Sequence, residues 1–188
     1  MKRIAVLLWM AVFSVFLTSR VQAQIFGGPE FMKGKIVVGG DIGAGAYGSS
    51  VYFGVAPQAG LRLTRSLELG VRLGYDLHYY YGYYYGNYFC HYFSGALYAN
   101  YEVFKGLFLH VEDEEMCELI RGSGVNTTSP SWYNSFFVGG GYRQYFSPSG
   151  FVFYALLYNL SWDYSYNGYF SSPYANPFVI RVGYCYAF

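Results

Sequence analysis

Four residues whose side chains bind metals or carry out acid–base chemistry lie close together in the sequence: Asp76, His78, Cys90 and His91. Histidine and cysteine are common ligands of zinc and related metals. The spacing of these four residues, however, matches no ligand pattern that we know. We therefore interpret Asp76 and His78 as an internal polar pair and the other two as loop residues. On this interpretation the protein has no metal, no cofactor and no enzymatic activity.

A larger set of charged residues recurs at alternate positions of apolar segments. In the stretch 67–79 (LELGVRLGYDLHY), apolar residues alternate with charged or small ones. Side chains alternate between the two faces of a strand, whereas a helix would not keep a period of two over this length. Together with similar alternation in other segments, this pattern places four arginines and five acids on the non-apolar faces of the predicted strands. They are Asp41, Arg62, Glu68, Arg72, Asp76, Glu102, Glu112, Arg143 and Arg181.

The alternation and the turn signals together predict eight strands, at 35–46, 51–63, 67–81, 92–104, 107–112, 132–146, 151–162 and 177–188. A β-bulge is expected at Pro57, because proline cannot donate to a strand ladder. Short connections (64–66, 105–106, 147–150) alternate with long ones (82–91, 113–131, 163–176), as in barrels of the bacterial outer membrane. The acidic residues 112–118 open the second long connection. We interpret them as a solvated loop edge rather than a calcium site, since no Asp-x-Asp-x-Asp-Gly pattern occurs.

Two architectures fit alternating strands: a soluble sandwich with its apolar faces inside, and a membrane barrel with its apolar faces outside. The last strand, 177–188, favours the barrel, because its apolar face is continuous and ends in aromatic residues. The predicted fold is therefore all-β, an eight-stranded antiparallel up-and-down transmembrane β-barrel. Such a barrel is only wide enough inside to hold side chains. The nearly balanced charges thus predict a packed ionic interior.

The N-terminus predicts export. Residues 1–23 combine Lys2 and Arg3, an apolar run and a small-residue cleavage site at 21–23, which is the pattern of a signal peptide. We expect residues 24–34 to form a short lead-in and residues 35–188 the barrel, located in the outer membrane. Without residues 1–23 the chain has nine basic and eleven acidic residues, a net charge of about −2. This charge argues against a nucleic-acid partner. Aromatic residues make up 23% of the chain, which suits the two membrane interfaces.

The three cysteines leave an odd thiol in an exported chain. Cys90 and Cys117 both fall beside predicted outer loops, so a disulfide could join them; the alternative is two free thiols. Cys185 lies near the other end of its strand and is expected to stay free.

Three segments resemble those of small outer-membrane β-barrel proteins of Gram-negative bacteria, of the porin-like type: 56–63 (APQAGLRL), 138–146 (VGGGYRQYF) and 176–184 (NPFVIRVGY). The C-terminal residues Tyr184, Tyr186 and Phe188 are similar to the signal that the barrel-assembly machinery reads in such proteins. The resemblance implies the fold, contact with outer-membrane lipid and lipopolysaccharide, and insertion by that machinery. It implies no catalytic residue.

The sequence therefore predicts a non-enzymatic outer-membrane barrel with a structural or surface-interaction role, carried out by its outer loops, which include the tyrosine-rich segment 83–89. Its partner there could be a protein. Three alternatives stay open at this point: a narrow passive channel, an accessory subunit of a larger outer-membrane complex, and a lipid-interface enzyme.

Overall fold

A computed structural model describes residues 36–47, 50–81, 87–122, 125–126, 130–147, 149–162, 174 and 177–188. The predicted signal peptide (1–23) and lead-in (24–34) lie outside the described residues, as do positions 83–86 of the tyrosine-rich segment. Within the described part of the chain, no helix is long and apolar enough to cross a membrane.

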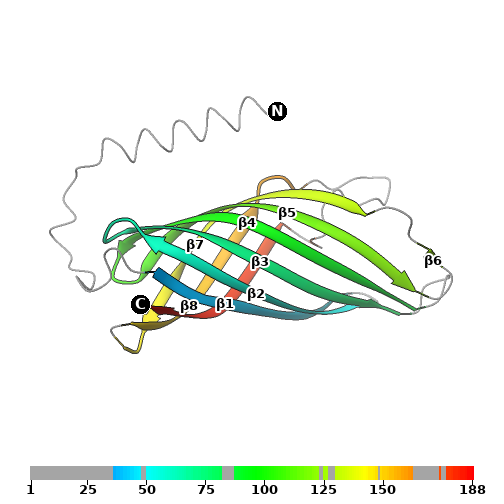
Figure 1. Cartoon of the computed structure of the whole chain (residues 1–188), viewed down its shortest axis with the longest axis horizontal. Helices are drawn as coiled ribbons and strands as arrows, with labels where there is room; N and C mark the ends of the chain where they lie inside the picture. Colours follow the sequence, from blue (N-terminus) through cyan, green and yellow to red (C-terminus); the bar gives the residue numbers. More distant parts are fainter. Residues whose placement is uncertain are drawn as a thin grey trace, which may run out of the picture.

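Eight long antiparallel strands form one closed sheet. Figure 1 shows the strands side by side around the barrel. Each pairs with its neighbours in sequence, and the last pairs with the first. A two-residue strand, β6 (Val125–Asn126), pairs with the end of β5. The long strands are β1 (Ile36–Tyr47), β2 (Ser50–Arg62), β3 (Leu67–Tyr80), β4 (Tyr88–Phe104), β5 (Leu107–Gly122), β7 (Ser131–Tyr145), β8 (Gly150–Asn159) and β9 (Phe178–Ala187). The predicted eight-stranded up-and-down barrel is confirmed.

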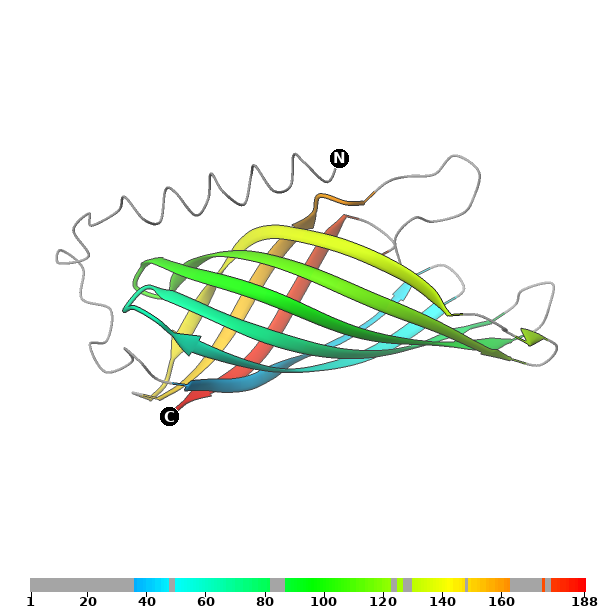
Figure 2. The ribbon, with the colours of Figure 1, turned by 45° about the horizontal axis from the view of Figure 1, so that its top comes forward.

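The strand register fixes the stagger of the barrel. Successive partners of Ile36, taken from β1 through β2 to β8, lead to Phe178 of β9. Phe178 lies four residues before Val182, which is the partner of Ile42. One circuit therefore ends ten residues further along β1 than it began. A stagger of this kind requires strands tilted by about 35–45° to the barrel axis, and Figure 2 shows the strands running obliquely.

One end of the barrel carries the short turns, the start of β1 and the end of β9; we call it the turn end. We call the opposite end the loop end. The turn end includes the Phe188 amide, which donates to the Ile36 carbonyl over 2.8 Å. In the two-residue turn Lys105–Gly106, both residues have positive φ (29° and 90°). Such turns match the twist of paired strands. The Thr64 hydroxyl closes another turn by accepting from the Leu67 amide over 2.9 Å.

The outer surface is mainly apolar between two aromatic belts, which is the polarity of a membrane barrel. The exposed aromatic residues of the turn end are Phe104, Tyr142, Phe146, Tyr184, Tyr186 and Phe188. Those of the loop end are Phe53, Phe89, Phe93, Trp132, Tyr158 and Phe178. Exposed aliphatic residues lie between the belts: Val38, Leu61, Leu69, Val71, Leu97, Leu109, Ile180 and Val182. The alternation predicted this division correctly.

The interior has two unlike walls. The inner faces of β3, β4 and β5 form an acid-rich wall, which carries Glu68, Glu102, Glu112 and Glu114. The inner faces of β7, β8, β9 and the start of β1 form an aromatic wall. Its buried cluster contains Val37, Phe137, Phe151, Phe153, Ala155, Leu157, Cys185 and Ala187, with Phe108 of β5 packed against them. Strand β8 is thus apolar on both faces.

Two local predictions are wrong. Strand β5 does not end at Glu112 but continues to Gly122, and it pairs with β4 as far as Tyr88, so residues 113–122 belong to the barrel rather than to a loop. No bulge occurs at Pro57. The register of β2 with β3 is the same on both sides of it, at Val55 with Tyr75 and at Gln58 with Arg72. Residues 56–57 have no paired residues on β3, so the missing proline N–H is accommodated without an extra residue in β2.

Candidate functional site: the charged interior

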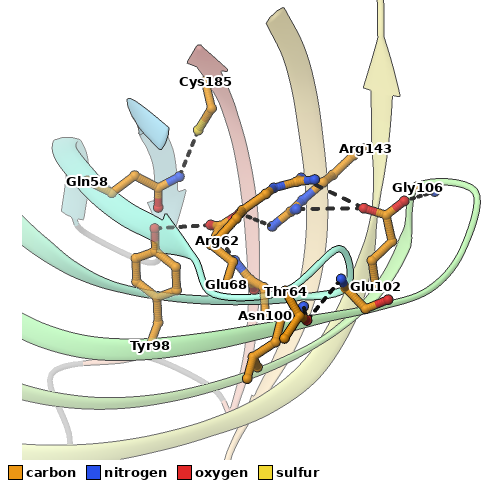
Figure 3. Close-up of polar contacts among 12 residues, drawn as sticks. Gln58, Arg62, Thr64, Glu68, Tyr98, Asn100, Glu102, Gly106, Arg143 and Cys185 are labelled. Atoms are coloured by element: carbon orange, nitrogen blue, oxygen red, sulfur yellow. Dashed lines mark hydrogen bonds and ion pairs between the residues drawn. The ribbon is translucent and has the colours of Figure 1, made fainter. Parts of the chain in front are cut away.

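The turn-end cluster consists of Arg62, Glu68, Glu102, Arg143 and Tyr145, which come from β2, β3, β4 and β7 (Figure 3). Both acids are shared by the two arginines, and Glu68 makes the closer contacts: its Oε2 lies 3.0 Å from Arg143 Nη2 and 3.5 Å from Arg62 Nε. Its other oxygen accepts from the Tyr98 hydroxyl and the Asn100 amide, each over 3.2 Å. The four charged members balance, two of each sign.

Glu102 connects the turn-end cluster to the turn at Lys105–Gly106. Its Oε2 accepts from the Tyr145 hydroxyl over 3.0 Å and lies 3.7 Å from Arg62 Nη2. Its Oε1 accepts from the backbone amide of Gly106 over 3.0 Å. The tight turn after β4 is therefore fixed to the buried network by a charge-assisted hydrogen bond.

The central cluster lies nearer the loop end and consists of Asp41, Arg72, His110, Glu112, Glu114 and Arg181. Arg72 binds Asp41 in a bidentate pair, with both nitrogen–oxygen distances at 2.9 Å. Its remaining terminal nitrogen donates to Glu114 over 3.2 Å. Arg181 donates to Glu112. The planar guanidinium group suits such multiple contacts better than an ammonium group does.

His110 and Asn100 connect the two clusters along the acid-rich wall. His110 Nε2 lies 3.2 Å from Glu112 Oε2 in the central cluster, and His110 Nδ1 lies 2.7 Å from Asn100 Oδ1. The Asn100 amide in turn donates to Glu68 of the turn-end cluster. An unbroken chain of polar contacts thus runs along the barrel interior.

The arginines also lie on the rings of the aromatic wall. The Arg143 guanidinium carbon is 4.9 Å from the centre of the Phe108 ring and 5.0 Å from that of Phe151. Arg181 lies 5.2 Å from the centre of the Phe137 ring. Each of these cations therefore has carboxylates on one side and an aromatic face on the other, and both surroundings compensate for the water it lost on burial.

Tyr174 joins the walls at the loop-end side of the central cluster. Its ring packs edge-on against Phe137, with centroids 5.2 Å apart, and its hydroxyl donates to Glu114. Its backbone carbonyl accepts from the Trp162 indole over 3.1 Å. A residue from the connection between β8 and β9 therefore reaches into the interior and covers a carboxylate that is fully buried.

At the loop end, Cys90, Tyr92 and Met116 form a small buried cluster beside Glu118. Glu118 accepts from the Tyr92 hydroxyl over 2.9 Å and from the Tyr133 hydroxyl over 2.6 Å. These contacts belong to the inner face of the part of β5 that the sequence assigned to a loop.

The structure brings eight of the nine predicted interior residues into the two clusters: Asp41, Arg62, Glu68, Arg72, Glu102, Glu112, Arg143 and Arg181. Asp76 points inward but is half-buried, and among the described residues no ion pair or hydrogen bond joins it to either cluster. The sequence interpretation missed Glu114, Glu118, Tyr145 and Tyr174. The alternation 112, 114, 116, 118 continued through the acidic run and could have identified the first two.

Of the two possibilities left open for Cys90 and Cys117, the structure has the two free thiols. Cys90 pairs with Ile120 and Cys117 with Phe93, so the two cysteines lie on opposite faces of the β4–β5 pair. Of the four residues considered for metal binding, Asp76, His78 and Cys90 lie on the inner face, with His78 directly opposite Cys90 on the neighbouring strand. His91 faces outward, where its ring nitrogen lies 3.0 Å from the Tyr75 hydroxyl, while His78 stacks on Tyr52. In the described part of the chain, no group of histidine, cysteine or acidic residues is arranged to hold a metal ion.

No protein-family model and no curated protein matches this sequence. Two solved structures are similar in shape. The N-terminal β-barrel domain of Pseudomonas aeruginosa OprF has a TM-score of 0.46 and 12% identity, over 84% of this chain and 99% of that one. A barrel from the de novo design of transmembrane β-barrels has a TM-score of 0.42 and 14% identity, over 83% and 97%. The barrel fold follows from the strand register, while the resemblance to the porin-like family stays a prediction.

Proposed function

We propose that this chain is a non-enzymatic barrel of the outer membrane that acts as a structural or surface-interaction protein and does not conduct solutes. The signal peptide at 1–23 would direct its export. Tyr184, Tyr186 and Phe188 would be read by the barrel-assembly machinery; all three are exposed on the turn-end belt. The apolar surface between the aromatic belts would contact lipid, including lipopolysaccharide in the outer leaflet.

The observation that carries this proposal is the filled interior. The two ionic clusters follow each other along the barrel axis and fill the lumen together with the aromatic wall. Every arginine of these two clusters is paired with a carboxylate. A cavity at their junction gives the centre of a water molecule only about 20 Å³ of space. A passage for ions would need a continuous column of water, and breaking buried ion pairs to create one costs several kcal/mol for each charge left unpaired.

Conductance across a planar lipid bilayer tests this proposal. The refolded chain lacking residues 1–23 should give no steady conductance at any holding voltage, while a general porin reconstituted in the same lipid shows that the assay works. A useful companion is the double variant Arg62→Ser, Arg143→Ser, in which the turn-end cluster loses both cations. Steady conductance of the unsubstituted chain would instead establish the narrow channel.

A second candidate function, a subunit of a larger outer-membrane assembly, is favoured by one feature of the outer surface. Asp113 and Glu115 of β5 are exposed on the lipid-facing side, between Leu97 on β4 and Phe136 on β7. The Asn134 side-chain amide donates to both carboxylates over 3.0 Å. Charged groups on this face are unfavourable in lipid, so a polar partner would explain them better than acyl chains do.

Co-purification in mild detergent tests the subunit hypothesis. A partner held by this surface should stay bound to the unsubstituted chain and be lost from the variant Asp113→Leu, Glu115→Leu. The variant Leu97→Ala, also on the outer face and next to Asp113, serves as the matched control and should retain the partner. If the leucine variant retains the same partner, the outer carboxylates do not hold it.

A further inference from the structure

A small cavity lies where the turn-end cluster, the central cluster and the aromatic wall meet. The turn-end cluster contributes Glu68 and Arg143 to its lining, the central cluster contributes Asp41 and Arg181 among others, and the aromatic wall contributes several side chains, including Phe151 and Leu157. The centre of a water molecule can move within about 20 Å³ of this cavity. About 10–15 Å³ of water-occupied space is enough for one water molecule, so the cavity has room for water.

Several residues that line this cavity have polar atoms with no hydrogen-bond partner among the described residues. Two are donors, Arg143 Nε and Arg181 Nη2, and one is an acceptor, Glu68 Oε2. Glu68 Oε2 does lie close to Arg143 Nη2, so its charge is compensated, but the contact lacks the geometry of a hydrogen bond. Buried polar groups in native proteins nearly always have partners, and ordered water often supplies them.

The mixture of unpaired donors and acceptors decides which ligand fits. An anion could accept from the arginines but would be repelled by Glu68 and Asp41. A metal cation could bind the carboxylate oxygens but would be repelled by Arg143 and Arg181. Water donates and accepts at once, so it alone among small species can serve both kinds of unpaired atom without adding charge. The four charged lining residues are also balanced, two of each sign.

We infer that one ordered water molecule is bound in this cavity, where it donates to the Glu68 carboxylate and accepts from Arg143 or Arg181. It joins the turn-end cluster to the central cluster on the side of the aromatic wall. The Asn100–His110 contacts join the same clusters on the side of the acid-rich wall. With both connections in place, the two clusters behave as one cooperative unit.

Water-selective nuclear Overhauser spectroscopy on the methyl-labelled chain, refolded in detergent micelles, tests this inference. The Ala155 methyl lines the cavity, whereas the Ala187 methyl is equally buried in the aromatic wall but does not line it. A cross-peak at the water frequency, with the sign of a long-lived contact, is expected for Ala155 and not for Ala187. Absence of the Ala155 cross-peak would overturn the inference.

Two substitutions at Ala155 give an independent measurement. Ala155→Val fills the cavity and displaces the water, so it should shift the urea midpoint of unfolding downward. Ala155→Ser offers a hydroxyl to the same unpaired atoms and should leave the midpoint closer to that of the unsubstituted chain. Filling a dry cavity would instead raise the midpoint, and that result with Ala155→Val would contradict a bound water.

Discussion

The acid-rich wall and the aromatic wall enclose one lumen but are stabilised by different means. On the acid-rich wall, the carboxylates of Glu68, Glu102, Glu112 and Glu114 meet arginines, tyrosines and amides. On the aromatic wall, Phe137, Phe151, Phe153 and Leu157 are buried as in a soluble core. Two arginines, Arg143 of β7 and Arg181 of β9, start from the aromatic side and reach the acids.

This difference shows how a narrow barrel buries charge without leaving it unpaired. A lumen lined all around with charged residues would need a hydrogen-bond partner for every group in every direction. Here Arg143 and Arg181 need hydrogen-bond partners on one side only, because the other side of each guanidinium group lies on a ring that favours a cation. The aromatic wall thus reduces the number of polar contacts that the interior must satisfy.

The largest effect should come from removing an arginine that spans the two walls. Arg143→Met keeps much of the side-chain volume but leaves Glu68 and Glu102 with Arg62 as the remaining cation of the cluster. Breaking a buried pair in this way typically costs about 3–5 kcal/mol. The free energy of unfolding, measured by urea titration in lipid vesicles with tryptophan fluorescence, should fall by about that amount. Arg65→Met, in the exposed turn after β2, is the control and should change it by well under 1 kcal/mol. Equal losses for the two variants would contradict the bridging role.

A smaller effect is expected from the hydroxyl that links the walls at the loop-end side. Tyr174→Phe keeps the ring against Phe137 but removes the donor to the buried Glu114 carboxylate. Hydrogen bonds to charged groups contribute about 1.5–3 kcal/mol, so a loss in that range is expected in the same titration. Tyr158→Phe removes a tyrosine hydroxyl from the outer surface and should have little effect. If Tyr174→Phe were as silent as Tyr158→Phe, Glu114 would not depend on this contact.

The two walls also differ in how well the sequence predicts them. On β3 the period of two between apolar and charged residues identified both faces and placed Glu68 and Arg72 inside. On β8 (GFVFYALLYN) both faces are apolar, so the polarity of its residues does not show which face forms the packed interior wall. The acidic run after Glu112 was assigned to a loop because Asp113 and Glu115 break the apolar outer face, although the inner set continued through Glu114. Tyr174 could not be predicted, since it lies in the predicted connection 163–176, where no alternation applies, and reaches Glu114 only through the closed fold.

Replacing a glycine by alanine should give the smallest effect. The two walls differ in the atoms that surround their glycines. A Cβ built on Gly74, in the acid-rich wall, would meet the Ser94 hydroxyl oxygen at 2.2 Å, with the next atoms at 3.5 and 3.6 Å. That hydroxyl has no hydrogen-bond partner and can rotate away. On Gly139, in the aromatic wall, the Cβ would meet the Leu156 carbonyl oxygen at 2.2 Å and the Leu157 Cα at 2.9 Å, and this backbone cannot move alone.

Gly74→Ala should therefore change the free energy of unfolding by less than about 1 kcal/mol, because the loss of glycine's freedom in the unfolded chain offsets the small rearrangement. Gly139→Ala should cost about 1–3 kcal/mol, as overpacking does in a rigid core. The two variants are measured side by side in the urea titration. The acid-rich wall presents the ends of side chains, which adjust, whereas the aromatic wall packs side chains directly onto neighbouring backbone. A larger loss for Gly74→Ala than for Gly139→Ala would show that the ionic wall is the more rigid of the two.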